Sequence, residues 1–191
     1  LDSSSGAVRV MSIDFKKAFE KLKHSVILSA ASKFDLPPYI MHWIASFLSD
    51  RYQRVSLPSQ KSPWVPVTSG VPQGSVLGPI LFCLALSSLK ARHTNTFIIK
   101  YADDVTFLHS IRNAEEDRLQ SEWNNLVVWS ESNGLPLNSA KCRVMDVITK
   151  KKMILKPIEC GDELFLKQVD DMLLLGVTIS SNMKLDIHIN N

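Results

Sequence analysis

Apolar and polar positions along the chain follow the periods of both strands and helices. Ala7–Ile13 is a nearly continuous apolar run, which is typical of a strand buried on both faces. Two further apolar runs, residues 96–99 and 105–108, flank a short break and predict a tight hairpin. The same reasoning predicts further strands over residues 51–57, 64–68, 144–149, 153–158 and 173–179.

Helical spacing of apolar residues is seen in four other segments. One helix is expected from Asp14 to about residue 33, and Pro37-Pro38 ends it and starts another over residues 39–48. A glycine-containing loop, residues 70–75, leads into an apolar helix over residues 76–89. Asn113 with Glu116 forms a capping-box-like start of a last helix, which Gly134 ends. This order predicts one α/β (α+β) domain over residues 1–191.

Two adjacent carboxylates occupy the tip of the predicted hairpin, in Tyr101-Ala102-Asp103-Asp104. Like charges this close repel, so each must stay hydrated or meet a cation, and oxygen ligands suit a divalent metal. Asp14 ends the first predicted strand. If that strand lies beside the hairpin, three carboxylates converge, as two Mg²⁺ ions about 3.5–4 Å apart require. The alternative is that Asp14 caps a helix and Asp103-Asp104 is a solvated turn.

Composition narrows the class of protein only slightly. The 45 % hydrophobic content is that of a chain with a real core, and the net charge of +3 permits a nucleic-acid partner without arguing for one. The three cysteines, which are far apart and form no CxxC pair, favour reduced buried thiols over zinc or disulfides: Cys83, Cys142 and Cys160. No apolar run approaches the roughly 18 residues of a membrane span, so no membrane partner is expected.

Three ordered motifs carry a family resemblance. Residues 14–19 (DFKKAF), 70–79 (GVPQGSVLGP) and 101–104 (YADD) closely resemble palm motifs of reverse transcriptases, in the form found in non-LTR (LINE-type) retrotransposons. Trp129 through residues 138–141 resembles the next palm motif, and residues 174–177 resemble the hairpin that grips the primer. The resemblance implies a polymerase palm, in which an antiparallel sheet carries the acidic hairpin and helices pack on one face.

The resemblance also implies a metal site. Asp14 and Asp103 would bind two Mg²⁺ ions (Mn²⁺ could replace them), Asp104 would be the third carboxylate, and the backbone carbonyl of Phe15 would be a further ligand. Lys141 matches a lysine that protonates the departing pyrophosphate, although a solvated surface lysine is the alternative.

Residues for the nucleotide and primer follow from the same resemblance. Phe19 would select deoxynucleotides by clashing with a 2′-OH, and its alternative is a core residue. The remaining family positions would line the nucleotide pocket (Gln73, Gly74, Tyr101, Ala102) and grip the primer (Leu175, Gly176). A plain turn at the Gln73 loop and a strand-filling role for Tyr101 are the alternatives. Residues 150–152, three lysines, could contact a nucleic-acid backbone or simply keep a hairpin tip soluble.

The function implied is that of an RNA-directed DNA polymerase, with an RNA template, a DNA primer and dNTPs as partners. Only thirteen residues precede Asp14, so we expect a fragment of a longer protein that carries fingers, thumb and an endonuclease domain. A nuclear location is suggested by analogy alone. One alternative is a catalytically inactive retroelement remnant that at most binds nucleic acid. Another is an RNA-templated RNA polymerase, against which Phe19 argues, because such an enzyme needs room for the 2′-OH.

Overall fold

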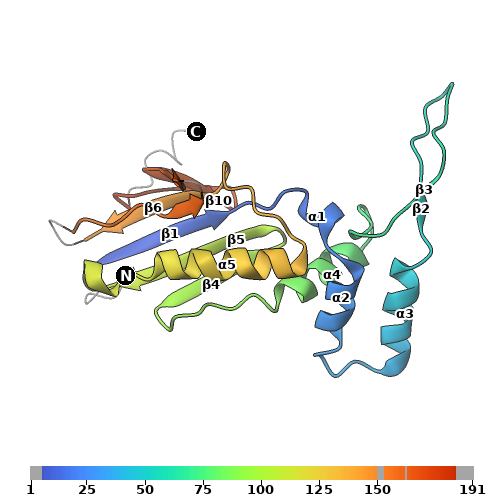
Figure 1. Ribbon diagram of the computed structural model, residues 1–191, viewed down its shortest axis with the longest axis horizontal. Helices are drawn as coiled ribbons and strands as arrows, with labels where there is room; N and C mark the ends of the chain where they lie inside the picture. Colours follow the sequence, from blue (N-terminus) through green and yellow to red (C-terminus); the bar gives the residue numbers. More distant parts are fainter. Residues whose placement is uncertain (1–5, 150–152, 162, 184–191) are drawn as a thin grey trace. The chain divides into compact units, whose positions relative to one another are not determined.

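The computed structural model describes residues 6–149, 153–161 and 163–183 (Figure 1). The chain forms two compact units. The first unit comprises residues 1–15, 89–130 and 137–191, and the second comprises residues 16–88 and 131–136. The expectation of a single domain over residues 1–191 stays a prediction.

A five-stranded sheet forms the centre of the first unit, in the order β4-β5-β1-β6-β9. Its neighbouring strands are antiparallel except for the parallel pair β6 and β9. The expected antiparallel sheet with a central apolar strand and an adjoining hairpin is therefore confirmed. Its strands are β1 (Ala7–Ile13), β4 (Thr96–Tyr101), β5 (Asp104–Ile111), β6 (Arg143–Ile148) and β9 (Lys167–Gln168).

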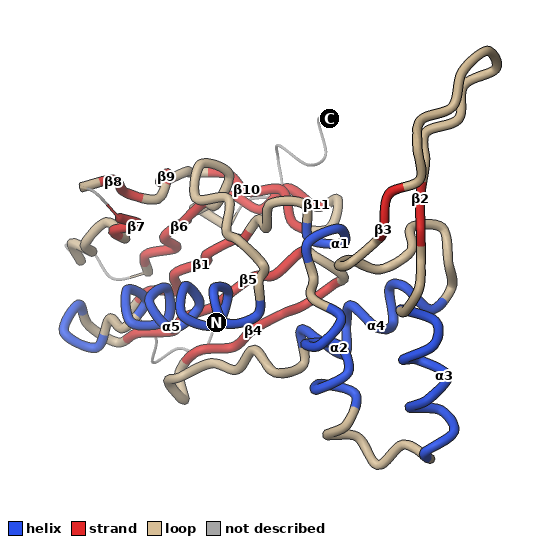
Figure 2. The backbone as a smooth tube through the Cα atoms, turned by 45° about the vertical axis from the view of Figure 1, so that its right-hand side comes forward, coloured by secondary structure: helices blue, strands red, loops and turns tan. Residues whose placement is uncertain are grey.

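One face of this sheet is covered by the helix α5 (Leu119–Asn133), as Figures 1 and 2 show. Leu119, Trp123 and Leu126 are its buried apolar residues. A helix on one face is what the palm resemblance implies. The helix ends before Gly134, whose φ of 67° is left-handed and suits glycine.

The opposite face is covered by a hairpin of β10 (Asp171–Leu174) and β11 (Val177–Ser180). Met172 of this hairpin packs with Val10 and Met145 of the sheet. The face that carries no helix is therefore buried by the hairpin that resembles a primer grip. A smaller hairpin is formed by β7 (Glu159–Gly161) and β8 (Leu164–Phe165).

Helices dominate the second unit, where α2 packs against both α3 and α4. Ile27, Leu48 and Phe82 are fully buried in its core. A thin two-stranded arm extends from this unit beyond α3 (Figures 1 and 2). The elements are α1 (Ala18–Lys21), α2 (His24–Ala31), α3 (Pro38–Leu48), α4 (Leu77–Leu86), β2 (Tyr52–Gln53) and β3 (Val65–Pro66). None of the helices in the described residues is long and apolar enough to cross a bilayer.

The single helix expected from Asp14 to about residue 33 is wrong. Lys17 adopts a left-handed φ of 52° and Leu22 is extended, so the segment divides into the short α1 and the separate α2. The backbone of residue 70 pairs with this break, because Gly70 N–H donates to the Leu22 carbonyl at 2.7 Å. A tertiary contact has thus replaced a helical hydrogen bond.

The capping box at Asn113 starts a different helix from the one expected. Asn113 caps the 3₁₀ turn η1 (Ala114–Glu116), and α5 begins only at Leu119, whose N–H donates to the Asp117 carboxylate at 3.1 Å. Asn113 does cap a helical turn, but the chain leaves that turn before the long helix α5 begins.

Four strand expectations need correction. Residues 153–158 form no strand, and residues 173–179 are two strands joined by a turn. Residues 51–57 and 64–68 pair over only two residues each, Tyr52 with Pro66 and Gln53 with Val65.

Candidate active site

The register of the central strands brings the three predicted acids to the same end of the sheet. Ile13, the last residue of β1, lies opposite Val105 of β5, so Asp14 and Asp104 are the next residues beyond the end of this antiparallel pairing. Asp103 lies in the adjoining turn, because β4 and β5 pair as far as Tyr101 and Asp104.

Ala102 occupies the first turn position with a left-handed φ of 50°. Two-residue hairpin turns need positive φ in at least one position, which is normally supplied by Gly or Asn. A residue with a Cβ in that conformation is a strained choice, and strain of this kind is concentrated at functional sites.

The negative charges of Asp103 and Asp14 act on the carboxyl of Asp104. Its pKa is raised above the ordinary value first by partial burial and then by the charges of Asp103 and Asp14. The charges of Asp103 and Asp14 therefore make ionisation of Asp104 more costly, and a bound cation would remove that cost.

Whether these residues fit a metal can be judged from their donors and their positions. Three carboxylates are the oxygen donors that a hard divalent cation takes. In the described part of the chain, however, no three His, Cys, Asp or Glu side chains are gathered as a metal cluster. One oxygen of Asp14 instead accepts a hydrogen bond from the side-chain amide of Asn138, at 2.8 Å. The donor chemistry fits Mg²⁺, and the side chains would have to turn towards it.

Asn138 is a site residue to which sequence reasoning assigned no role. Besides its side-chain bond, its backbone N–H donates to the Asp14 carbonyl at 2.8 Å. Asp14 is thus held through both its main chain and its carboxylate. The segment that follows Gly134 returns to β1 and continues into β6, and an amide side chain at that return is the signal that could have identified Asn138.

Phe15 lies in an isolated antiparallel bridge with Leu137. The hydrogen bonds of this bridge come from flanking residues: Asn138 donates to Asp14, and Lys16 donates to the Pro136 carbonyl at 2.7 Å. In such a pair the carbonyl of Phe15 points away from Leu137. Its buried ring tilts against Trp129 with the centroids 6.3 Å apart. The buried ring thus anchors Phe15, while the Phe15 carbonyl makes neither of the two hydrogen bonds of the bridge.

Cys142 lies directly behind Asp14. The Asp14 N–H donates to its sulfur at 3.4 Å, and burial above all raises the pKa of the Cys142 thiol to about 11. A neutral thiol therefore supports the acid without adding a charge. Of the three thiols that are expected to be buried, Cys142 is buried, Cys160 is partly buried and Cys83 is exposed, so the expectation is wrong for Cys83.

Lys141 is an exposed side chain in the turn that precedes Cys142. Its backbone N–H donates to the Asn138 carbonyl at 2.8 Å. The lysine therefore belongs to the same short turn that holds Asp14. Residues 150–152, the other predicted basic site, lie outside the described residues.

The β10–β11 turn borders the acidic hairpin. A cavity of about 200 Å³ is lined by Tyr101, Asp104, Leu175, Gly176 and Ser12, among others. The structure therefore brings the two predicted primer-grip residues to the same end of the sheet as the acids.

The remaining predicted nucleotide residues belong to the second unit. Phe19 is half-buried and its ring stacks on Phe82, with the centroids 4.5 Å apart. The alternative for Phe19, a residue of the core, is therefore met in part. The stack on Phe82 also holds the Phe19 ring in one orientation.

The glycine loop lies against the segment that carries Phe19. Val71 N–H donates to the Phe19 carbonyl at 2.8 Å. At Gly70, with φ 82°, an added Cβ would lie 2.6 Å from the same carbonyl, so only glycine fits. At Gly74, with φ 80°, nothing lies within 4 Å of an added Cβ, and the backbone there is open to a ligand.

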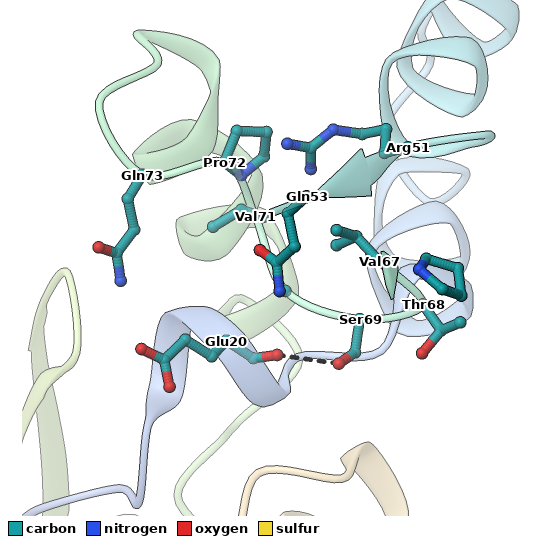
Figure 3. Close-up of a pocket in the computed structure, with 11 residues that line it drawn as sticks. Glu20, Arg51, Gln53, Val67, Thr68, Ser69, Val71, Pro72 and Gln73 are labelled. Carbon is teal, nitrogen blue, oxygen red and sulfur yellow. Dashed lines mark hydrogen bonds between the residues drawn. The ribbon is translucent and has the colours of Figure 1, made fainter. Parts of the chain in front are cut away.

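Gln73 of this loop lines a cavity of about 550 Å³, shown in Figure 3. The base of the arm contributes Arg51 and Gln53 to the same cavity, and Arg51 extends towards Pro72. Ser69 and Glu20 also line this cavity, and the Ser69 hydroxyl donates a hydrogen bond to the Glu20 carbonyl at 2.9 Å. The second unit thus has its own polar cavity around the glycine loop.

Known proteins support the resemblance in sequence. The family model for reverse transcriptase (RNA-dependent DNA polymerase) matches residues 1–179. The RNA-directed DNA polymerase from mobile element jockey of Drosophila melanogaster is 32 % identical over 68 % of this chain and 15 % of that protein. The probable RNA-directed DNA polymerase from transposon BS of the same fly is 29 % identical, over 93 % of this chain and 20 % of that protein. The chain thus spans only 15 to 20 % of the length of these two relatives.

Solved structures show the same fold. A telomerase from Candida tropicalis, in complex with a fragment of telomeric RNA, matches 97 % of this chain and 30 % of its own, with a TM-score of 0.69 at 14 % identity. The apo enzyme, truncated from its C-terminal domain, matches with a TM-score of 0.66 at 16 % identity, over 97 % of this chain and 36 % of its own. With the family match over residues 1–179 and this fold, the chain belongs to the reverse transcriptase (RNA-dependent DNA polymerase) family.

Proposed function

We propose that this chain is the palm of an RNA-directed DNA polymerase, which adds deoxynucleotides to a primer 3′-OH on an RNA template. The observation that supports the proposal is the β1–β5 register, which brings the end of β1, directly before Asp14, beside the start of β5 at Asp104 and the turn at Asp103. The raised pKa of Asp104, to which the charges of Asp103 and Asp14 contribute, also supports a site made of these three acids.

In the proposed reaction the primer 3′-oxygen bonds to the α-phosphorus of the nucleotide. The bond from that phosphorus to the bridging oxygen breaks, pyrophosphate leaves, and the hydroxyl proton passes to water. Asp14 and Asp103 would hold two Mg²⁺ ions, with Asp104 and the Phe15 carbonyl as further ligands. When bound, the ions supply charge stabilisation for the attacking and leaving oxygens.

The chain's own residues position these groups. Asn138 and Cys142 hold the Asp14 main chain through hydrogen bonds at 2.8 and 3.4 Å. Lys141, exposed in the same turn, is the proposed proton donor to pyrophosphate. Leu175 and Gly176, beside Asp104, are the proposed primer contacts.

The residues of the second unit would meet the incoming nucleotide. Phe19 is held by its stack on Phe82, so its ring is the proposed barrier to a ribose 2′-OH. Gln73 and Gly74, on a loop open to ligand, would contact the nascent base pair, and Tyr101 and Ala102 of the first unit the primer end and the nucleotide sugar.

Primer extension tests the proposal. The chain is expressed within its longer reading frame and supplied with an RNA template, a DNA primer, dNTPs and Mg²⁺. Asp103→Asn should reduce extension by at least about 100-fold, because transition-state electrostatics are the largest catalytic contribution. The exposed Asp170→Asn is the matched control and should leave extension unchanged.

Two results would contradict the proposal. One is an absence of extension by the longer wild-type protein. The other is equal extension by Asp103→Asn and Asp170→Asn. Absence of extension with retained RNA binding would indicate the inactive remnant instead.

A further inference from the structure

The two-stranded arm of the second unit, residues 51–67, has a composition unlike that of the chain around it. It carries three cations, Arg51, Arg54 and Lys61, and no acidic residue. In the described part of the chain, no ion pair joins any of these three to an acid. Their charge is therefore available to an anionic partner.

The arm has a defined backbone despite its short ladder. Tyr52 pairs with Pro66 and Gln53 with Val65, and a bridge joins Ser56 to Lys61 nearer the tip. Val67 N–H donates to the Arg51 carbonyl at 2.8 Å and closes the base. The arm therefore presents its side chains from a paired scaffold, and its charges are spread from base to tip.

Aromatic rings lie between these charges. The side chains of Tyr52 and Trp64 are 62 % and 59 % exposed. The Arg54 guanidinium lies 4.4 Å from the centre of the Trp64 ring, so it holds one face of the ring by a cation–π contact. Phosphate-binding cations interleaved with rings on which bases can stack are what single-stranded nucleic acid requires.

The base of the arm continues into the cavity around Gln73. Arg51 and Gln53 line that cavity together with Pro72 and Gln73 of the glycine loop (Figure 3). Under the proposed function, on which this inference rests, Gln73 contacts the nascent base pair. Beyond that pair a growing primer has no nucleotides, so the only strand that continues is the unpaired template.

We propose that the β2–β3 arm binds the single-stranded RNA template ahead of the nascent base pair. Arg51, Arg54 and Lys61 contact successive phosphates, and a base stacks on the ring of Trp64. The exposed apolar rings of the arm are thereby covered by bases, and its unpaired cations by phosphates.

Binding of a labelled single-stranded RNA of 12 nucleotides, followed by fluorescence anisotropy from 50 to 200 mM salt, tests the proposal. The protein is the 191-residue chain carrying Asp103→Asn, so the readout does not depend on polymerisation. The triple variant Arg51→Ala/Arg54→Ala/Lys61→Ala should weaken binding and lower the slope of log Kd against log salt by about 2, since each contact on a single strand contributes about 0.7. Trp64→Leu should weaken binding by roughly 5- to 150-fold at unchanged slope.

A matched control removes three exposed lysines outside the arm: Lys33→Ala/Lys90→Ala/Lys167→Ala. It makes the same change in net charge and should retain most of the binding. A duplex RNA of equal length should be affected less than the single strand by Trp64→Leu, because its bases are already stacked. Circular dichroism melts of all variants establish that each is folded.

Equal losses in the arm and control triples would overturn the proposal, and so would an equal effect of Trp64→Leu on duplex and single strand. These outcomes are separate from failure of the proposed function. Loss of extension with intact arm-dependent RNA binding would overturn only the polymerase, and extension without arm-dependent binding would overturn only the arm.

Discussion

At the scale of single residues, the acidic end of the sheet is stabilised less well than its surroundings. Asp104 is exposed, yet burial of part of its carboxyl and the charges of Asp103 and Asp14 raise its pKa. A folded-state pKa above the unfolded value means that ionisation opposes folding. That cost is fully present above the folded pKa and fades as the pH falls towards the unfolded value.

Asp104→Asn should therefore raise the melting temperature of the metal-free chain at pH 7. The expected rise is about 1–3 °C, because exposed charge pairs are worth roughly 0.2–1 kcal/mol and a protein of this size shifts about 2–4 °C per kcal/mol. The rise should shrink as the pH falls towards 4. Addition of Mg²⁺ should stabilise the wild type more than the variant, since a ligand of the folded state stabilises it by mass action.

Thermal melts from pH 4 to 8, with and without Mg²⁺, provide the measurement. Asp170→Asn, which changes an exposed acid outside the β4–β5 hairpin, is the control and should behave as wild type. A lower melting temperature for Asp104→Asn without metal would show that the three acids do not repel one another.

At the scale of elements, the β10–β11 hairpin carries an unfavourable turn. Leu175 has φ 48° and Gly176 has φ 82°, and a two-residue turn with positive φ at both positions favours Asn-Gly. Leu175 is also 57 % exposed, so burial does not account for the leucine. A strained and exposed apolar side chain beside Asp104 suits a role in contacting a primer.

Leu175→Asn should relieve this strain and stabilise the isolated chain by about 1 kcal/mol. The same change should raise KM for the primer–template in the longer protein, with a smaller effect on kcat. Chemical denaturation measures the first effect and steady-state extension the second. Stability that falls, or a KM that does not change, would remove the functional reason for leucine at this turn.

At the scale of the whole molecule, a buried arginine joins distant segments of the first unit. Arg9 of β1 is fully buried, and it contacts Asp146 at 2.8 Å, Asp117 at 2.6 Å and the Lys156 carbonyl at 3.0 Å. His109 lies beside Asp117, and burial lowers its pKa, so its neutral form accepts the Arg118 N–H at 2.9 Å. This network fixes the segment before α5 against the sheet that carries the acids.

Arg9→Ala should destabilise the chain by about 3–5 kcal/mol, because it leaves two partly buried carboxylates unpaired. Arg112→Ala is the control. Its ion pair with Glu116 spans 2.9 Å, but the Arg112 side chain is 70 % exposed, so its removal should cost much less stability than the loss of Arg9. Equal losses in urea unfolding of the two variants would show that the buried network contributes nothing special.

The local pattern of the chain was sufficient for the elements that depend on near neighbours. The apolar run at Ala7–Ile13, the acidic hairpin at Asp103-Asp104 and the end of α5 at Gly134 were all predicted from it. Alternation and turn chemistry involve residues two to four positions apart, so they are visible in one sequence. The resemblance to family motifs indicated which acids of the chain would be metal ligands.

The tertiary structure alone decided what depends on distant residues. It paired β1 with β5 so that their ends next to Asp14 and Asp104 lie side by side, and it brought Asn138 and Cys142 to Asp14 across more than 120 positions of sequence. It also divided the first predicted helix in two, because the Leu22 carbonyl accepts a hydrogen bond from the Gly70 N–H instead of from the next helical turn. Register and packing arise from contacts that form only when distant segments meet, and no local periodicity encodes which segments these are.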